Sequence, residues 1–290
     1  SFRYIFQTDI FTSLQKKAEQ IVVLVPDKYD VYFDKIKSYK NVIIDDYRHD
    51  ECEEYSKSSK FHNLLRICRS FIQNEKFDIT TAKGHHQVFI NDYLAKNKRL
   101  KHKFFLFTVN SIVFLGRKLK FFRKFIQSLE NFLFTPKIHT DIFKKYKPNA
   151  LLVTSLGTFD YDQLFIRQAR KNNIKTISTI LSWDNSTTRG YPSSDCDQII
   201  TWTETMKNEL VNLCDINASK IHVGGVAHYD KYFDNSYLHS RNELNSLLKI
   251  DFDSKLIFFA TKSPNCYLSN PYVTKLILEA IKENVFEKKY

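Results

Sequence analysis

The stretch IKTISTILSWDNSTTRG, residues 174–190, joins a run of β-branched residues to a dense group of polar side chains. Its first part has the composition of a buried β-strand. The second part, SWDNSTTRG, contains a tryptophan, a carboxylate, an amide, a guanidinium and several hydroxyl groups. A plain turn needs only Asn, Asp or Gly to reverse the chain. We therefore predict that this strand ends at the lip of a ligand cleft. The alternative is an Asx turn at Asp184 and Asn185 with Trp183 in the core.

Similar β-branched runs recur along the chain and alternate with amphipathic helical patterns. The runs are residues 4–8, 21–26, 41–45, 150–155, 174–181, 197–202, 220–226 and 255–261. Strands that are apolar on both faces and alternate with helices are typical of a parallel sheet covered by helices. The sequence thus predicts an α/β fold with a Rossmann-like parallel sheet, in which residues 4–45 and 150–226 form one sheet.

One long segment, residues 54–147, interrupts this alternation with mainly helical patterns and one short candidate strand at 87–90. From 93 to 129 it contains no Asp or Glu, while ten Lys and Arg residues are interleaved with phenylalanines. This basic segment has three interpretations: a solvated face of a helical insertion, a nucleic-acid site, or a surface that docks on an anionic membrane. No motif typical of RNA or DNA binding accompanies the charge, so nucleic acid is the least favoured partner.

The composition narrows the class of protein. The 290 residues are 43% hydrophobic and carry a net charge of +12, which allows a sizeable core and excludes global disorder. The five cysteines form no C-x-x-C pair, so a disulfide framework and a zinc ribbon are disfavoured and a cytoplasmic location is expected. Neither a secretory signal nor a membrane-spanning segment is visible. The positive charge predicts anionic ligands or surfaces.

The end of the chain has its own pattern. Residues 251–254 resemble a linker, 255–261 a new strand and 270–290 a helix. One strand and one helix do not make a domain. We therefore predict an N-terminal domain over 1–250, with the insertion at about 54–147, and a second domain that begins at 251–290. The alternative is that this last unit packs back on the first domain.

The succession SWDN, DQIITWTETMKNEL (197–210) and KIHVGGVAHYDKY (220–232) resembles bacterial GT-B-type glycosyltransferases of surface-polysaccharide synthesis. These are related to CDP-glycerol glycerophosphotransferases and nucleotide-sugar 2-epimerases. The resemblance covers residues 150–262 and implies a GT-B N-terminal domain followed by a truncated, nucleotide-binding second Rossmann-like domain. The chain departs from the pattern in two places: it lacks a proline near Ala227, and QTDIFTSL replaces a glycine-rich loop.

The resemblance implies a function. A sugar would move from a nucleotide-sugar donor to a glycan or lipid-linked acceptor, with no cofactor and no bound metal. The expected location is cytoplasmic, with peripheral association on the inner face of the cell membrane. A CDP-glycerol-type glycerophosphotransferase or a nucleotide-sugar epimerase is the alternative enzyme. A non-catalytic membrane or glycan-binding module is the alternative of another class.

Loops after parallel strands bind ligands in open α/β sheets, and this rule selects the candidate residues. Loops 155–162, 182–190, 202–204 and 224–230 are expected to converge on one cleft. The candidate catalytic residues are Asp184, Asp160 and His86. The candidate substrate-binding residues are Ser182, Trp183, Asn185, Trp202, Glu204, Gly224, Gly225 and His228.

Two further sets extend this prediction. Lys262 and Ser263 follow the last candidate strand and are expected to bind the nucleotide phosphate. Lys118, Lys120, Arg123 and Lys124 are expected to bind the membrane. The competing interpretation in each case is a turn or a solvated charge.

Overall fold

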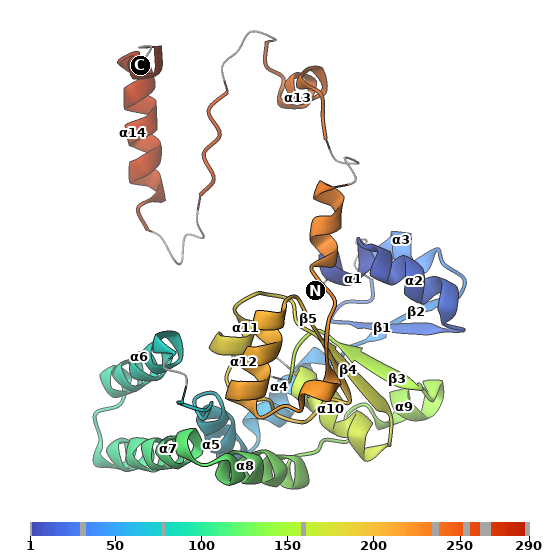
Figure 1. The fold of residues 1–290 in the computed structure, drawn as a ribbon, viewed down its shortest axis with the longest axis vertical. Helices are drawn as coiled ribbons and strands as arrows, with labels where there is room; N and C mark the ends of the chain where they lie inside the picture. The colour runs from blue at the N-terminus through green and yellow to red at the C-terminus, as the bar shows by residue number, and fades with distance from the viewer. Residues whose placement is uncertain are drawn as a thin grey trace. The chain divides into compact units, whose positions relative to one another are not determined.

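A computed structural model describes residues 2–29, 33–76, 79–157, 161–233, 238–251, 256–261 and 268–287 (Figure 1). The chain forms two compact units, Ser1–Asp234 and Asn235–Tyr290. This division falls earlier in the chain than the boundary near residue 250 expected from the sequence.

The first unit contains a four-stranded parallel sheet. Its strands are β3 (Ala150–Val153), β4 (Lys175–Thr179), β5 (Gln198–Thr201) and β6 (Ile221–Val223), hydrogen-bonded in that order. Helix α10 (Asp162–Lys171) lies between β3 and β4 in sequence, and α12 (Glu204–Cys214) lies between β5 and β6. Each of these strands was expected from its β-branched run, and the α/β fold with a parallel sheet is confirmed.

The first two strands stand apart from this sheet. β1 (Ile21–Val25) pairs in parallel with β2 (Val42–Asp46) as a separate two-stranded sheet. The prediction of one continuous sheet is therefore wrong. Helices α2 (Asp9–Lys17) and α3 (Asp34–Lys37) accompany this pair, and Phe11, Ile36 and Val42 form a small core of their own. Because these strands have their own core, they have buried apolar contacts without joining the larger sheet.

Three predicted strands are also wrong. Residues 4–8 overlap helix α1 (Phe2–Phe6), and residues 87–90 lie inside α6 (Thr80–Lys96). Periodicity cannot separate a short apolar run in a helix from one in a strand. The described part of the last run, 256–261, has no strand, and Phe258 in it is exposed. A strand needs a neighbour to pair with its backbone groups.

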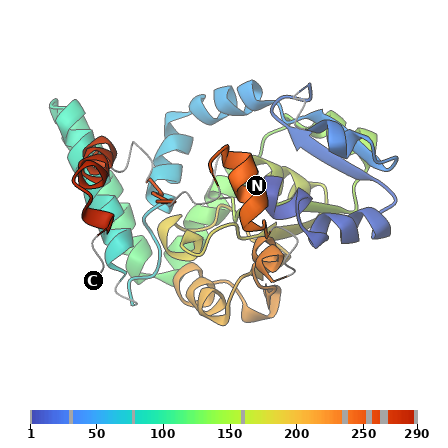
Figure 2. The same ribbon diagram turned by 90° about the horizontal axis from the view of Figure 1, so that it is seen from above.

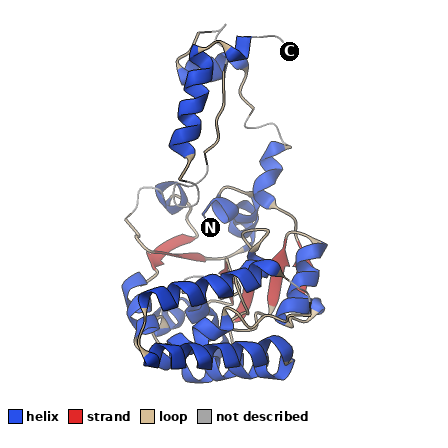
Figure 3. Cartoon of the chain, turned by 90° about the vertical axis from the view of Figure 1, so that its left-hand side faces the viewer, coloured by secondary structure: helices blue, strands red, loops and turns tan. Residues whose placement is uncertain are grey.

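The segment between β2 and β3 is helical, as predicted. Its helices are α4 (His49–Lys57), α5 (Lys60–Arg69), α6, α7 (Leu100–Lys118), α8 (Lys120–Leu133) and α9 (Thr140–Tyr146). Figures 1 and 2 show α5 to α8 grouped beside the sheet, and Figure 3 shows that this layer is wholly helical. Leu65, Val109 and Ile126 from this layer share one hydrophobic core with Val153 and Ile199 of the sheet.

A buried ion network joins the helical layer to the sheet. The carboxylate of Glu130 in α8 accepts a hydrogen bond from Nε of Arg69 in α5 at 2.9 Å and another from Arg167 in α10. Gln163 in α10 accepts from both guanidinium groups, at 3.0 and 3.2 Å. Burial alone would raise the pKa of Glu130, but the two arginines and His62 hold it well below its usual range. Glu130 is therefore ionised at neutral pH.

The second unit is small. Its described helices are α13 (Arg241–Leu248) and α14 (Asn270–Lys282). A capping box fixes the start of α13, because the Ser240 hydroxyl accepts from the backbone of Glu243 while the Glu243 carboxylate accepts from the backbone of Ser240. The strand that would make this unit Rossmann-like is absent from its described residues.

We predict that Glu130→Gln lowers the free energy of unfolding by about 3–5 kcal/mol, because it leaves two buried guanidinium groups without an anionic partner. Urea unfolding at pH 7 measures this loss. Glu53→Gln is the matched control: Glu53 pairs with Lys57 on the surface of α4, where solvent screens the pair and its loss should change the stability far less. Equal losses in both variants would contradict a stabilising role for the network.

The pH dependence follows from the sign of the shift. The pKa of Glu130 is lower in the folded state than in the unfolded state, where a glutamate has a pKa of about 4.3. The ionised carboxylate therefore stabilises the folded state fully above the unfolded-state pKa. This stabilisation is lost progressively as the pH falls toward the folded-state pKa. The difference between wild type and Glu130→Gln should therefore shrink in acid. A difference that stays constant from pH 7 down to pH 3 would contradict this.

Candidate functional site

The loops that follow β4, β5 and β6 lie at one edge of the sheet. These strands are parallel neighbours, so their carboxyl ends point the same way. Asp184 follows β4 and Glu204 follows β5, which places both at this edge, while the convergence of the four loops on one cleft stays a prediction. Ligands of open parallel sheets bind at such an edge.

The segment 182–188 forms a short turn of helix rather than a free loop. Asp184 precedes α11 (Asn185–Thr188). Its carboxylate accepts from the Ser182 hydroxyl at 2.5 Å and from the Thr188 hydroxyl at 3.2 Å. Burial raises the pKa of Asp184, but the hydrogen bonds from Ser182 and Thr188 outweigh it and leave the pKa below its usual value. Asp184 is therefore a charged acceptor and a weak base at neutral pH.

Some of the polar residues in 182–190 are buried or form hydrogen bonds within the protein. Ser186 donates through its hydroxyl to Glu209 of α12, and its carbonyl accepts from the Gln73 amide at 2.9 Å. Asn185 is buried, and its side-chain oxygen has no hydrogen-bond partner among the described residues. These contacts tie α11 to α12 and to the end of α5. The predicted Asx turn is not seen, because the Asp184 carboxylate accepts from hydroxyl groups and makes no cap hydrogen bond to the backbone of α11.

Gly190 lets the chain pass close to α5. Its φ is +77°, and a Cβ at this position would lie 2.6 Å from the Cα of Ser70. The next residue, Tyr191, is fully buried: its amide donates to the Arg69 carbonyl at 2.9 Å, and its carbonyl accepts from the Arg69 guanidinium at 2.8 Å. The loop after β4 and the end of α5 therefore fit together through backbone contact.

A cavity of about 160 Å³ opens between α5, α6 and α11. Its walls are Ser70, Phe71, Gln73, Ala82, His85, Thr187, Thr188 and Arg189. A single water needs only roughly 10–15 Å³ of such space, so the cavity can hold a larger polar molecule. Hydroxyl, amide, imidazole and guanidinium groups converge here. The cavity has the mixed donors and acceptors that a hydroxylated or phosphorylated ligand requires.

Trp183 belongs to the same loop as the cavity residues Thr187, Thr188 and Arg189, and its side chain is 74% exposed. The alternative interpretation, a core tryptophan, is therefore wrong. Exposing the apolar surface of an indole ring to water is unfavourable. Tryptophan side chains are enriched at interfaces, where a partner covers this surface. Trp183 is thus available to stack on a ligand.

Trp202 belongs to an aromatic cluster at the same edge. Its indole N–H donates to the Ile180 carbonyl at 2.7 Å. Its ring stacks on Tyr4 of α1 at 5.7 Å and lies 5.7 Å from the ring of His228. Desolvation lowers the pKa of His228, with Asp230 opposing the shift. This cluster joins the end of β5 to η3 (Ala227–Tyr232) and to the N-terminal helix.

The two histidines of the HH pair have different environments. His86, the predicted base, is buried against Phe71 with a ring separation of 4.8 Å. Burial, and then the charge of Arg117, lowers its pKa. His86 does not line the cavity, whereas the exposed His85 does. A ligand in this cavity would therefore contact His85 rather than His86.

The remaining predicted binding residues are on the surface of the edge. Glu204 is exposed and begins α12, where a carboxylate suits the helix dipole. Gly224 donates its amide to the Thr201 carbonyl at 2.8 Å, and Gly225 has a φ of +77° in open space. These glycines turn the chain after β6. Asp160, Lys262 and Ser263 lie outside the described residues, so their roles stay predictions.

Two of the four predicted membrane residues are engaged inside the protein. Arg123 is 2% exposed and forms a bidentate pair with Asp215, at 2.7 and 3.0 Å. Lys124 pairs with Asp195 at 2.9 Å. Arg123 therefore cannot contact a membrane, and the assignment is wrong for it. Lys118 and Lys120 are exposed.

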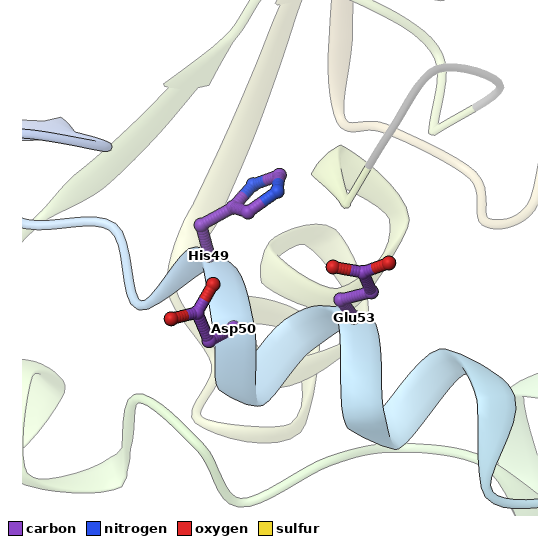
Figure 4. A group of neighbouring side chains, drawn as sticks. All are labelled: His49, Asp50 and Glu53. Carbon is purple, nitrogen blue, oxygen red and sulfur yellow. The ribbon is translucent and has the colours of Figure 1, made fainter.

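One group of side chains has the composition of a metal site. His49, Asp50 and Glu53 of α4 offer ligand atoms that lie within 4.8 Å of one another (Figure 4). His49 and Asp50 are exposed, and Glu53 already pairs with Lys57. The group also lies in the first turns of a helix, where the dipole favours anions over cations. It is a weak candidate for a metal.

The four cysteines that the structure describes do not provide a nucleophile. Cys52, Cys68, Cys196 and Cys214 are buried and free among the described residues. Burial raises the pKa of Cys68 and of Cys214 to about 12. A thiol with such a pKa carries almost no thiolate at neutral pH.

No known protein family, curated protein or solved structure matches the chain. Within the described residues, no helix has the length and apolarity that crossing a membrane requires.

Sequence reasoning missed the far wall of the cavity. Ser70, Gln73 and His85 come from α5, α6 and the turn between them, more than 90 residues before the β4 loop. The rule that selects loops after strands cannot find residues on helices. The one available signal was the pair His85–His86, of which His85 lines the cavity.

We predict that Gly190→Ala lowers the free energy of unfolding by more than about 2 kcal/mol, because the new methyl group meets the Ser70 backbone in a conformation that L-residues disfavour. Gly84→Ala in α6 is the control. Nothing lies within 4 Å of its new methyl group, and alanine should stabilise this helix by about 0.5–1 kcal/mol. Thermal or urea unfolding measures both, and a neutral Gly190→Ala would show that the two segments are not held in contact.

Proposed function

We propose that the chain is a GT-B-type glycosyltransferase. It moves a sugar from a nucleotide-sugar donor to a hydroxyl group of a glycan or lipid-linked acceptor in surface-polysaccharide synthesis. The observation that carries this proposal is that one loop, which follows strand β4 of the parallel sheet, both lines a polar cavity through Thr187–Arg189 and exposes Trp183. Ligand sites of open α/β sheets occur at this edge.

The groups at the edge suit a sugar. A sugar ring has a C–H face that stacks on an indole and a rim of hydroxyls that hydrogen-bond, which matches Trp183 beside Thr187 and Thr188. The Asp184 carboxylate already accepts two hydroxyl hydrogen bonds. A carboxylate has about four acceptor positions, so Asp184 can also accept from a ligand hydroxyl.

The cavity residues can share the chemical work. In the transfer, the acceptor oxygen bonds to the anomeric carbon while the bond from that carbon to the donor phosphate breaks. The acceptor hydroxyl loses its proton, and the leaving diphosphate gains negative charge. We assign His85 as the group that accepts this proton and Arg189 as the group that stabilises the diphosphate charge, because both line the cavity.

The alternatives differ in their products. A glycerophosphotransferase would release a nucleoside monophosphate and form a new phosphodiester. An epimerase would convert one nucleotide sugar into another without an acceptor. A glycan-binding module would bind acceptor and release no nucleotide. Incubation of the full chain with nucleotide donors and glycan acceptors, followed by mass spectrometry of products, separates these outcomes.

The test of the ligand site uses the fact that the chain has only two tryptophans, Trp183 and Trp202. In Trp202→Phe, fluorescence reports on Trp183 alone. We predict that acceptor glycans or nucleotide sugars shift its emission and protect it from acrylamide quenching. Trp183→Ala should weaken ligand binding at least tenfold with a change in stability below about 0.5 kcal/mol, because the side chain is exposed.

Phe132→Ala provides the control, since Phe132 is an exposed aromatic residue of α8. It should leave ligand binding unchanged. Ligand binding that is detected by saturation-transfer NMR but leaves Trp183 fluorescence unaltered would contradict the proposed site.

A second observation favours peripheral association with the inner face of the cell membrane. Helix α7 is apolar on two opposite faces. Leu106, Val109 and Val113 are buried, whereas Phe104, Phe107 and Phe114 are 72%, 68% and 56% exposed. The exposed residues are spaced by three and seven positions and form one stripe along the helix. Contiguous apolar surface of this kind marks an interaction site.

The charge around this stripe selects an anionic partner. The segment 93–129 has no acidic residue, and Lys101, Lys103 and Lys118 of α7 are exposed. A helix with aromatic residues on its outer face and flanking lysines is typical of binding in the plane of an anionic membrane. Such a location would bring the protein to a lipid-linked acceptor.

We predict that the triple variant Phe104→Ser, Phe107→Ser, Phe114→Ser binds vesicles containing phosphatidylglycerol more than tenfold more weakly than wild type, since burying each ring contributes about 1.5–3 kcal/mol. Vesicle cosedimentation at two salt concentrations measures this and shows the screening of the lysines. Phe233→Ser, which changes an exposed ring outside α7, should bind as wild type. Equal binding of wild type to neutral and anionic vesicles would contradict an electrostatic contribution.

A further inference from the structure

A second cavity, of about 220 Å³, lies away from the site described above. It lies between the start of α8, the segment before β5 and the turn after α12. Its charged lining residues are Lys120, Lys124, Lys220, Asp195 and Asp215. Ser194 and Asn217 add a hydroxyl and an amide. The proposed sugar transfer does not use this cavity, although Lys120 and Lys124 belong to the set predicted to bind the membrane.

Both carboxylates in the lining are already matched. Asp215 accepts two hydrogen bonds from the Arg123 guanidinium and a third from the Tyr191 hydroxyl at 3.1 Å. Asp195 accepts from Lys124 at 2.9 Å. Each of these acids is therefore neutralised by its own cation.

Two ammonium groups remain in excess. Lys220 donates to the Cys196 carbonyl at 3.3 Å, and this contact leaves its charge uncompensated. Lys120 forms no ion pair within the described part of the chain. It is also the first residue of the fourteen-residue helix α8, where the dipole adds positive potential. The cavity thus carries about two positive charges that no group among the described residues neutralises.

We propose that this cavity binds a phosphate group, with Lys120 and Lys220 as its cationic ligands. A phosphate carries close to two negative charges and has several acceptor oxygens, so it matches two lysines together with the side-chain NH₂ group of Asn217. Lysine is a point-charge donor to phosphate and needs no bidentate geometry. The ligand class is a phosphate monoester or a phospholipid headgroup, and this site does not depend on the proposed sugar transfer.

The first experiment titrates the full chain with inorganic phosphate at constant ionic strength and follows binding by ³¹P NMR and calorimetry. We expect saturable binding that weakens at least tenfold in Lys120→Gln, Lys220→Gln. The matched control is Lys16→Gln, Lys17→Gln in α2, which removes the same net charge from exposed positions outside both the cavity and the basic segment. The control should bind phosphate as wild type, and both variants should keep the wild-type unfolding temperature in the absence of phosphate within a few degrees.

The outcomes decide the proposal. No saturation by phosphate in wild type, or equal binding by wild type and Lys120→Gln, Lys220→Gln, would overturn it. Equal weakening by the control pair would also overturn it, because the effect would then be one of total charge.

A second experiment identifies the source of the phosphate. Competition by a sugar 1-phosphate indicates a soluble ligand, and competition by phosphatidylglycerol vesicles but not phosphatidylcholine vesicles indicates a lipid headgroup. Each result supports the site if the cavity variant loses it and the control variant keeps it.

Discussion

The buried carboxylate of Glu130 is the constraint on which the arrangement of the first unit depends. An ionised group with no exposed surface is costly unless charged donors surround it. Here the donors come from Arg69 in α5 and Arg167 in α10, and Gln163 bridges the two guanidinium groups. Because the charges are complementary only when α5, α8 and α10 meet, the network selects one placement of the helical layer against the sheet.

That placement also shapes the candidate site. Arg69 binds the Tyr191 carbonyl, and Ser70, the next residue, lies against Gly190. The loop after β4 is therefore pressed onto α5, and the cavity forms between this loop, the end of α5 and α6. The residues of SWDNSTTRG have two roles. Ser186 holds the loop in place through its hydrogen bond to Glu209, while Trp183 is exposed to solvent and free to contact a ligand. A loop held this firmly can present a ligand site without first becoming ordered.

The sequence predicted most of the sheet, because β-branched runs such as 175–179 and 198–201 report directly on buried strands. The sequence wrongly predicted a strand at residues 4–8, which overlap a helix. Tyr4 of this helix contacts the Trp202 ring, and a contact between residues so far apart in the chain cannot be predicted from a local pattern. The common edge of Asp184 and Glu204 could be predicted from strand direction alone. The choice between His85 and His86 could not, because it depends on which face of α6 packs against Phe71. Arg123 shows the same limit: its buried partner, Asp215, is 92 residues away.

The Glu130 network also bears on how this fold can change in evolution. Residues 54–147 look in the sequence like a module inserted between two parts of a sheet. Yet Glu130 and Arg69 lie inside this segment while Arg167 and Gln163 lie outside it. Deleting the segment would leave Arg167 as a buried cation without a carboxylate partner in the remaining domain. A domain that never contained the segment would need different residues at positions 163 and 167. The segment is thus an integral part of the domain, and related domains that lack it should carry apolar or small residues at these two positions.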